Sequence, residues 1–378
     1  MAVERPLRVI HFVTGGFSGG ATQVAIALVN AHRAGDAIEP LLVLRRKRRT
    51  DPARIAELRN AGVPLEVVTG AAHIATVLSL ARLCRRWKPD VLVAHGFSEH
   101  LWGRYAGLLA HVPALVHVEH NTRERYTPWR RAQTRWLAQR TARVVGCSEG
   151  VRQVLLGMGM PPERTIAIPN GIRVTPFVRI DMLPVQARVP GIVMVARFSK
   201  QKDHATLVRA VAILRERGLA PPVMFAGAGK RAHREPVEKL ARELGLDDQV
   251  QFLGLHRDVP ALLMRHRLCV LSTHYEGMPL ALIEGMAAGC AVIGSAVPGV
   301  RETLHDGVDG RLVPEGDPAA LADVIEHLLR DDAEAARLAA AARAAALTRY
   351  SRERMAADYE TMLLDVAAEA GVTRSARS

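Results

Sequence analysis

Aromatic side chains and cysteines are scarce in this sequence of 378 residues, in which only 4% of the residues are Phe, Trp or Tyr. We therefore expect cores built from aliphatic side chains. The four cysteines are scattered and form no Cys-x-x-Cys pair, which favours reduced, partly buried thiols over a disulfide framework. The segment Met1–Arg8 lacks the apolar stretch of a signal peptide, so we expect a cytoplasmic protein.

Motifs of several common enzyme classes are also absent. No Asp-x-Asp motif occurs, and no His/Cys cluster has the spacing of metal ligands, so the sequence provides no metal site. No Gly-x-Gly-x-x-Gly with a later acidic residue follows the first expected strand, which argues against a nicotinamide-dependent oxidoreductase. The weakly polar stretch Leu280–Val300 contains Glu284 and four glycines, which is more typical of a helix, a turn and a buried strand than of a membrane span.

Basic residues exceed acidic ones, with 51 Lys and Arg against 38 Asp and Glu, which is a net charge of +13. Basic clusters at Arg45–Arg49 and in the stretch Arg123–Arg143 lie in the first half of the chain. Such an excess favours anionic partners, which include nucleic acid, an anionic membrane surface and phosphorylated small molecules. A solvated basic surface explains it equally well. The scarce aromatics and the lack of a recognisable binding module argue against specific nucleic-acid binding.

Short β-rich runs alternate with helix-period segments along the chain. Because each parallel connection needs a crossover, this alternation predicts an α/β fold with two parallel sheets, each covered by helices on both faces. The expected strands of the first sheet are Leu7–Val13, Leu41–Leu44, Leu65–Val68, Val91–His95, Ala114–Glu119 and Val144–Gly146. Those of the second sheet are Ile192–Ala196, Val223–Ala226, Val250–Leu253, Cys269–Ser272 and Ala291–Ile293.

The two halves are separated by a turn signal at Ile168–Gly171 and by a stretch with several prolines and no clear periodicity. We expect an N-terminal domain at residues 1–175, a linker at 176–190 and a C-terminal domain at 191–350. Residues 351–378 should form a final helix, which is a candidate to pack back onto the N-terminal domain, and a frayed tail.

A glycine-rich loop, Thr14–Ala21, follows the first expected strand and leads into a helix. Gly16, Gly19 and Gly20 would let backbone amides approach an anion at the helix N-terminus. The spacing is neither the dinucleotide fingerprint nor a P-loop, so a plain turn is an equally good interpretation of this loop alone.

A cationic loop carries Arg197 and Lys202 at the carboxyl end of the expected strand Ile192–Ala196. Ligands of open α/β sheets bind at that edge, and a guanidinium fork with a compact ammonium suits a diphosphate. An ordinary basic loop is the alternative.

The most specific segment is His274–Met286. Pro279 fits the first turn of a helix, which puts Glu276 in the preceding loop and Glu284 more than a turn into the helix. Two carboxylates there could bracket a polyhydroxyl ligand by accepting hydrogen bonds from vicinal hydroxyls. The alternatives are a solvent-facing Glu276 and a Glu284 paired with a basic neighbour, because an unpaired charge in an apolar stretch is costly to bury.

Glu276 and Glu284, with seven residues between them, resemble the signature of retaining glycosyltransferases with the GT-B fold, the glycogen-synthase-like group that includes family 4. Further segments that resemble this family are the glycine loop, Pro169–Ile172, Arg197 with Lys202, Pro298–Glu302 and Asp309–Pro314. The resemblance implies two Rossmann-like domains that face each other across a cleft. It also implies a hexosyltransferase whose co-substrate is a nucleoside-diphosphate sugar, with no other cofactor.

The resemblance assigns roles to these residues. Arg197 and Lys202 would hold the donor diphosphate, Glu284 would bind the ribose hydroxyls, and Glu276 with the loop amides would engage the donor sugar. His120, which ends an expected strand, would face the transferred sugar, although a lone histidine is more often structural. The implied catalytic residues are Arg197, Lys202, His120 and Glu276. The implied donor-binding residues are Gly16, Gly19, Gly20, Arg197, Lys202, Glu276, Gly277, Met278, Pro279, Leu280 and Glu284.

Two positions depart from the family pattern. Arg173 stands where an acidic residue commonly follows Asn-Gly-Ile, and Ala21–Gln23 replaces a segment in which an acidic residue is common. We expect these changes to affect the identity of the acceptor more than the chemistry of the donor.

The resemblance also implies a mechanism, which is metal-independent transfer with retention of anomeric configuration and without a protein nucleophile. The expected acceptor is lipid-linked, a saccharide or a small molecule, in the synthesis of cell-envelope glycans or glycolipids. A nucleotide-sugar epimerase of similar architecture and a nucleic-acid-binding protein stay open as alternatives. The mixture of basic and aromatic residues at Arg45–Arg49 and Trp129–Trp136 further indicates peripheral attachment to the inner face of a membrane. An internal helix that packs on its neighbours explains Trp136 equally well.

Overall fold

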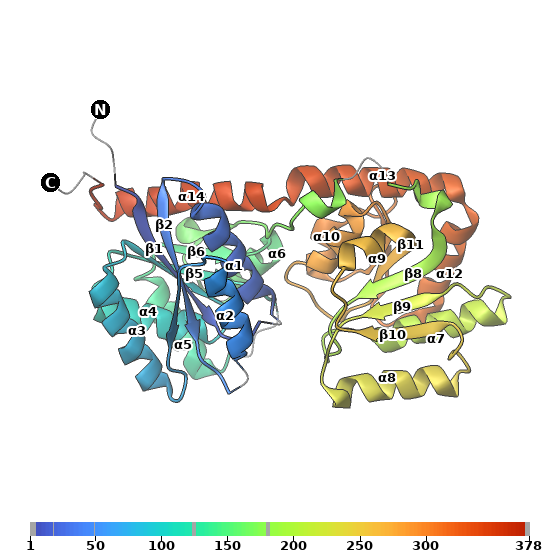
Figure 1. Ribbon diagram of the computed structural model, residues 1–378, viewed down its shortest axis with the longest axis horizontal. Coiled ribbons are helices and arrows are strands. Elements are labelled where there is room, and N and C mark those ends of the chain that lie inside the picture. Colours follow the sequence, from blue (N-terminus) through green and yellow to red (C-terminus); the bar gives the residue numbers. More distant parts are fainter. Residues whose placement is uncertain (1–4, 18, 49, 123–125, 179–181, 375–378) are drawn as a thin grey trace. The chain divides into compact units, whose positions relative to one another are not determined.

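The computed structural model describes residues 5–17, 19–48, 50–122, 126–178 and 182–374. The chain divides into two compact units (Figure 1). The first unit comprises Met1–Gly171 and Arg352–Ser378, and the second comprises Ile172–Ser351. The segment expected as a linker, 176–190, groups with the second unit, and its last residues already belong to a strand that begins at Val189. Ser18 of the glycine loop and Arg49 of the basic cluster lie outside the described residues.

In the described part of the first unit, seven parallel strands form one sheet in the order β3-β2-β1-β4-β5-β6-β7. The strands are β1 (Leu7–Thr14), β2 (Ile38–Arg45), β3 (Leu65–Val68), β4 (Val91–His95), β5 (Ala114–Glu119), β6 (Arg143–Gly146) and β7 (Thr165–Ala167). Both faces are buried, as their near-continuous apolar runs predict. In β4, Val91 and Val93 join the hydrophobic cluster on one face, and Leu92 and Ala94 join the cluster on the other.

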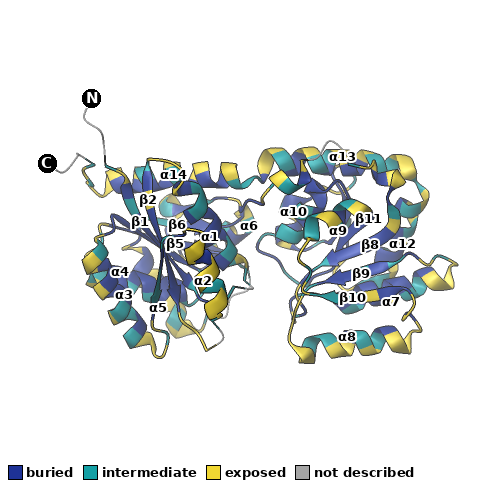
Figure 2. Cartoon of the chain, viewed as in Figure 1, coloured by how far each residue is buried: buried dark blue, intermediate teal, exposed yellow. Residues whose placement is uncertain are grey.

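Helices cover both faces of this sheet (Figure 1). They are α1 (Gly20–His32), α2 (Pro52–Asn60), α3 (His73–Trp87), α4 (Glu99–Leu109), α5 (Pro128–Ala138), α6 (Glu149–Gly157) and α14 (Arg352–Glu369). The clusters place α1 and α14 against one face and α3 and α4 against the other. α14 is the last helix of the chain, and it contributes Met355, Tyr359 and Leu363 to the core of the first unit. Figure 2 shows the strands as buried and the outer helix faces as exposed.

The second unit repeats this architecture. Its described part holds six parallel strands in the order β10-β9-β8-β11-β12-β13. The strands are β8 (Val189–Val195), β9 (Val223–Ala226), β10 (Val250–Gly254), β11 (His266–Leu271), β12 (Ala291–Ser295) and β13 (Arg311–Val313). The helices are α7 (His204–Glu216), α8 (Arg231–Glu243), α9 (Val259–Arg265), α10 (Leu280–Ala287), α11 (Pro298–Thr303), α12 (Pro318–Arg330) and α13 (Asp332–Arg349).

The expected α/β fold with two Rossmann-like parallel sheets is therefore confirmed. The sequence analysis missed β7 and β13, which lie at sheet edges and contain three residues each, because runs of that length show no periodicity. In each sheet the strand order reverses once, between β1 and β4 in the first unit and between β8 and β11 in the second. Ligands of open α/β sheets bind beyond the carboxyl ends of the strands at such a switch point. The loops after β1, β4, β8 and β11 are therefore the first places to look for a site.

Candidate functional site

The two loops at the switch point of the second unit are joined by a continuous set of hydrogen bonds. The backbone N–H of His274, after β11, donates to the carbonyl of Gln201, after β8, over 2.9 Å. The Thr273 hydroxyl oxygen lies 3.0 Å from the same carbonyl. The Ser272 hydroxyl donates to the carbonyl of Asp203 over 2.7 Å, and the Asp203 N–H donates back to the carbonyl of Ser272 over 3.1 Å. Each loop is thus held in place by the other.

Lys202 and Glu276 form an ion pair across this junction. The Glu276 carboxylate also accepts hydrogen bonds from the Thr273 hydroxyl at 2.8 Å and from the Gln201 side-chain amide at 3.2 Å. The Lys202 side chain is 12% exposed and that of Glu276 is 6% exposed. A pair this buried needs such additional hydrogen bonds, because the protein interior solvates the two charges poorly.

Arg197 is exposed at the start of the loop after β8, and its guanidinium donates to the side-chain oxygen of Gln201 over 3.3 Å. The amide nitrogen of Gln201 donates to Glu276, which is the ion-pair partner of Lys202. Gln201 therefore contacts Arg197 directly and Lys202 through Glu276. Helix α7 then begins at His204, and the carboxylate of its N-cap residue, Asp203, accepts from the backbone N–H of Thr206 over 3.2 Å. This cap fixes the end of the cationic loop.

Helix α10 carries Glu284 and begins directly after the Glu276 loop, with Pro279 as its N-cap residue. Glu284 is partly exposed, while the next residue, Gly285, faces the sheet so closely that a Cβ there would lie 2.5 Å from the Cys269 sulfur. The helix thus turns Glu284 away from the core. Two buried or half-buried arginines, Arg188 and Arg343, donate to carbonyls at its C-terminal end. Their positive charges interact favourably with the negative end of the helix dipole.

Gly277 and the neighbouring loop backbone lie against Gly299, the second residue of α11. A Cβ at Gly299 would lie 2.6 Å from the Glu276 carbonyl oxygen and 2.7 Å from that of Gly277. Only glycine permits this approach, so α11 supports the loop that holds Glu276, Gly277 and Met278.

The glycine loop of the first unit is held by the first turn of α1. The Thr22 hydroxyl donates to the Gly16 carbonyl over 2.8 Å, and the Gln23 amide donates to the Phe17 carbonyl over 2.9 Å. Thr22 and Gln23, which depart from the family pattern, thus shape the loop. A Cβ at Gly19 or Gly20 would meet no described atom within 4 Å, so open space adjoins these two residues.

His120 lies directly after β5, and its Nε2 is 3.3 Å from Nδ1 of His95 at the end of β4. Burial, together with the neighbouring His117, lowers the pKa of His120 to about 3, so its ring is neutral at physiological pH. The structure brings the predicted site residues together in two groups. Arg197, Lys202, Glu276, Gly277, Met278, Pro279, Leu280 and Glu284 lie in the second unit, and Gly16, Gly19, Gly20 and His120 lie in the first.

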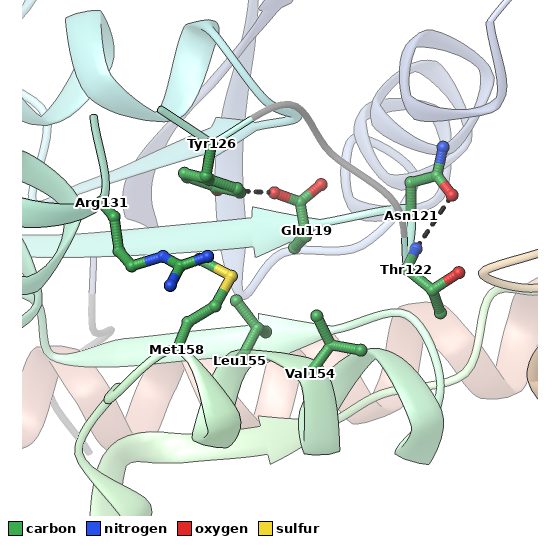
Figure 3. Close-up of a pocket in the computed structure, with 8 residues that line it drawn as sticks. All are labelled: Glu119, Asn121, Thr122, Tyr126, Arg131, Val154, Leu155 and Met158. Atoms are coloured by element: carbon green, nitrogen blue, oxygen red, sulfur yellow. Dashed lines mark hydrogen bonds between the residues drawn. The ribbon is translucent and has the colours of Figure 1, made fainter. Parts of the chain in front are cut away.

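A small cavity of about 160 Å³ adjoins Glu119, the last residue of β5 (Figure 3). It is lined by Glu119, Asn121, Thr122, Tyr126, Arg131, Val154, Leu155 and Met158. Burial raises the pKa of the Glu119 carboxyl to about 7, while hydrogen bonds from the His120 N–H and the Tyr126 hydroxyl, at 2.9 and 3.0 Å, oppose the rise.

Comparisons with known proteins agree with this geometry. Residues 184–345 match the family model "Glycosyl transferases group 1", and residues 18–175 match "Glycosyltransferase Family 4". The chain is 28% identical over 365 residues to the lipopolysaccharide core biosynthesis glycosyltransferase LpsE of Rhizobium meliloti, covering 94% of this chain and 99% of that protein. The chain belongs to the GT-B glycosyltransferases.

Two further relatives of this glycosyltransferase are informative. The Escherichia coli UDP-Gal:alpha-D-GlcNAc-diphosphoundecaprenol alpha-1,3-galactosyltransferase is 25% identical over 258 residues, which cover 64% of this chain and 67% of that protein. The crystal structure of Anabaena HepE in complex with UDP and glucose has the same fold, with a TM-score of 0.82 and 21% identity over 95% of this chain and 100% of that one.

The candidate site contains residues that the sequence analysis missed. Gln201 and Thr273 connect the loops after β8 and β11, and Glu119 adjoins the cavity. Gln201 lies one residue before Lys202, and Thr273 lies three residues before Glu276, so both lie next to segments that the sequence analysis had singled out. Their roles depend on contacts between loops more than 70 residues apart, which no local pattern shows.

The basic cluster at Arg45–Arg49 does not act as a free cationic surface over its whole length. Arg45 is buried and pairs with Glu99 at 3.1 Å, and Lys47 pairs with the same carboxylate at 3.4 Å. The expectation that the whole cluster faces a membrane is therefore wrong at Arg45, because its charge is used inside the fold. Among the described residues, no helix is both long and apolar enough to cross a membrane.

Two groups of described residues bring possible metal ligands together, namely His100 with His117 and Glu119, and His327 with Asp331 and Glu334. The first group combines α4 with β5, so sequence spacing could not reveal it. The residues of this first group already take part in a chain of hydrogen bonds that runs from Arg104 to Glu119. The Arg104 guanidinium donates to His100 Nδ1 over 2.6 Å, which leaves the proton of the neutral ring on Nε2. That nitrogen lies 2.9 Å from the Tyr126 hydroxyl, which donates to Glu119.

Tyr126→Phe should raise the pKa of Glu119 further above 7, because the Tyr126 hydroxyl stabilises the ionised carboxylate. The pKa of Glu119 in the folded protein already lies above the ordinary value of 4.5, so the folded state keeps the proton to a higher pH than the unfolded state does. The free energy of unfolding should therefore fall as the pH rises from 4.5 to about 7. In Tyr126→Phe it should continue to fall at higher pH. Carbon-detected NMR titration of glutamate carboxyls measures the midpoint directly. Tyr105→Phe is the matched control and should leave it unchanged. A midpoint near 4.5 in the unmodified protein, or a lowered one in Tyr126→Phe, would refute this assignment.

Proposed function

We propose that this glycosyltransferase moves a hexose from a nucleoside-diphosphate sugar to an acceptor, with retention of anomeric configuration and without a catalytic metal. The observation that carries the proposal is the joined pair of loops after β8 and β11, which places Lys202 against Glu276 at the switch point of the second sheet. UDP and glucose in the structurally similar HepE support a nucleotide sugar as the donor.

Arg197 and Lys202 bind the donor diphosphate in this proposal. Arg197 is exposed at the sheet edge, and Lys202 is held there by Glu276, so both cations are in place before the donor arrives. Negative charge grows on the leaving phosphate in the transition state, where preorganised cations stabilise it most. The two side chains thereby supply the charge that a divalent ion provides in metal-dependent enzymes.

Glu284 and the Glu276 loop bind the two sugars of the donor. Glu284 lies on the partly exposed side of α10 and accepts hydrogen bonds from the ribose hydroxyls. Glu276 engages the donor hexose together with the backbone of Gly277 and Met278, and Pro279 and Leu280 start the helix beside them. Gly16, Gly19 and Gly20 contribute space and amides from the first unit, and His120 faces the hexose.

The transfer follows a front-face course. The bond from the anomeric carbon to the leaving phosphate oxygen breaks, and a bond from that carbon to the acceptor oxygen forms on the same face. The acceptor proton passes to the leaving phosphate oxygen, so charges and atoms balance without a protein nucleophile. This course rests on the resemblance to retaining members of the family.

The acceptor belongs to cell-envelope glycan or glycolipid synthesis in this proposal. The names of relatives support it, since one is a lipopolysaccharide core glycosyltransferase and another acts on a sugar linked to diphosphoundecaprenol. A lipid-linked sugar, a free saccharide and a small molecule are the acceptor classes to test.

The purified protein should transfer sugar from at least one uridine, guanosine or adenosine diphosphate sugar to such an acceptor in the presence of excess EDTA. The product should keep the anomeric configuration of the donor. Mass spectrometry and NMR of the products measure both. Loss of activity in EDTA with recovery in magnesium or manganese would refute metal independence, and formation of an epimer from the donor alone would favour the alternative, a nucleotide-sugar epimerase.

We also propose that the first unit attaches to an anionic membrane surface through α3, α4 and α5. Trp129 and Trp136 are 72% and 48% exposed on α5, two turns apart on one side of the helix. Trp136 stacks with Tyr105, which stacks with Trp102 of α4. Ile74, on α3, is 76% exposed.

Cations accompany this aromatic surface. The Arg140 guanidinium lies 4.0 Å above the Trp136 ring, and Arg82 on α3 and Arg131 on α5 are exposed. Exposed tryptophans beside arginines suit the interface of anionic lipids, where the ring enters the headgroup region and the cation meets phosphate.

The protein should bind vesicles that contain anionic phospholipid at low salt, and added salt should weaken the binding. The double variant Trp129→Ala, Trp136→Ala should lose at least tenfold in vesicle affinity, while Arg231→Gln, an exposed arginine of the second unit, should bind normally. Vesicle sedimentation measures this. Equal binding by the double variant, or no binding by the unmodified protein, would contradict the proposal.

A further inference from the structure

An apolar groove of about 450 Å³ lies in the second unit, between helix α9 and the strands β8, β9 and β10 (Figure 1). We call it the α9 groove. It reaches Val189 and His266, the first residues of β8 and β11, whereas Lys202 and Glu276 follow the carboxyl ends of these strands. The α9 groove thus extends to the edge of the sheet opposite to the proposed donor site. Its lining residues are Val189, Met224, Leu253, His256, Ala261, Leu262, Arg265 and His266.

The connections of the second sheet leave this groove open. Helix α8, which joins β9 to β10, packs on one face of the sheet, where the Arg234 guanidinium lies 6.0 Å from the centre of the Phe252 ring. Successive side chains of a strand point to opposite faces, so Leu253 points to the face on which α9 lies. Helix α9 covers that face with only seven residues, and Met224 and Leu253 stay partly exposed beside it.

Most of the surface inside the α9 groove is hydrocarbon. Val189, Met224, Leu253 and Leu262 are half-buried, and Ala261 is exposed, so these apolar side chains remain in contact with solvent. Removing such a surface from water is favourable, and the volume of the groove is typical of sites that hold small molecules. The groove therefore suits an apolar chain.

The charge at the groove is positive, because none of its lining residues is acidic. Arg265, the last residue of α9, is exposed and forms no ion pair with a described residue. His256 is half-buried in the loop before α9, and Nδ1 of His266 donates to the Leu262 carbonyl over 2.8 Å. Asp258 caps the opposite end of α9, where it accepts from a backbone N–H. A negatively charged group therefore complements the groove at Arg265.

We propose that the α9 groove binds a long-chain fatty acid, with the hydrocarbon chain along Met224, Leu253 and Leu262 and the carboxylate at Arg265. A guanidinium can donate two hydrogen bonds to one carboxylate, so a single arginine suits this head group. A peptide fits less well, because the apolar lining leaves its backbone N–H and C=O groups without partners. A second copy of this chain would bring its net charge of +13 against the same charge.

Titration with dodecanoate tests the proposal directly. In protein labelled with carbon-13 in the methyl groups of methionine and leucine, the signals of Met224, Leu253 and Leu262 should shift until saturation and show NOEs to the acyl chain. Dodecanol has the same chain without the charge and should bind about tenfold more weakly. Absence of these NOEs, or equal affinity for dodecanoate and dodecanol, would overturn the proposal.

Two variants separate the cation from the apolar lining. Arg265→Gln should weaken dodecanoate binding about tenfold and leave dodecanol binding unchanged. Ala261→Glu should abolish dodecanoate binding by charge repulsion, and it should fold normally because Ala261 is exposed on a helix. Arg242→Gln is the matched control, since Arg242 is exposed in the last turn of α8, and it should bind both ligands normally. An equal loss in Arg242→Gln would trace binding to the net charge and overturn the site.

Two further measurements distinguish the remaining explanations. Light scattering should show the same molar mass with and without Ala261→Glu, whereas a dimer that this variant dissociates would identify a second copy as the occupant and overturn the proposal. The double variant Trp129→Ala, Trp136→Ala should bind dodecanoate normally. Loss of dodecanoate binding in that variant would place the ligand on the aromatic surface of the first unit instead. None of these results depends on sugar transfer, so the proposed function and the fatty-acid site can fail separately.

Discussion

The ion pair between Lys202 and Glu276 is the interaction on which the account of the site depends. It joins residues 74 positions apart in the chain, at the point where the strand order of the second sheet reverses. Both side chains are almost buried, so removing either one would leave a charge poorly solvated. The surrounding hydrogen bonds from Gln201 and Thr273 go to the carboxylate, which shows that the loop is built around Glu276.

The first unit differs from the second in that it holds several buried polar side chains within a parallel sheet whose faces are otherwise apolar. His11, His95 and His120 contact one another through their ring nitrogens, and a hydrogen-bond chain runs from Arg104 through His100 and Tyr126 to Glu119. Arg104 is fully buried, and burial lowers the pKa of its guanidinium to about 10. Tyr126, Tyr105 and Glu119 act in the opposite direction and raise this pKa. Networks of this kind restrict each member to few arrangements.

The fold and much of the candidate site could be predicted from the sequence because both depend on local patterns. Apolar runs separated by helix-period segments predicted the parallel sheets. The expected strand ends at Ala196 and Ser272 lie one residue beyond the observed ends of β8 and β11, so the sequence also located the loops that follow them. The pairing of these loops could not be predicted, since hydrogen bonds such as that from Gln201 to Glu276 join segments that meet only in the folded sheet. For the same reason, the sequence did not reveal the ion pair of Arg45, the raised pKa of Glu119 or the contacts among His11, His95 and His120.

Calorimetric titration with UDP, GDP and ADP tests the central claim, which is that the junction of Lys202 and Glu276 is the nucleotide-sugar site. For the nucleotide that binds best, Lys202→Met and Glu284→Gln should each weaken binding about 10- to 100-fold, or roughly 1.5–3 kcal/mol, because each removes a charged hydrogen-bonding group. Glu276→Gln should leave binding of the free nucleotide nearly unchanged, because the free nucleotide lacks the hexose that Glu276 engages. Glu243→Gln, an exposed control on α8, should change nothing. Unchanged binding by Lys202→Met, or equal losses in Glu276→Gln and Glu284→Gln, would contradict the account.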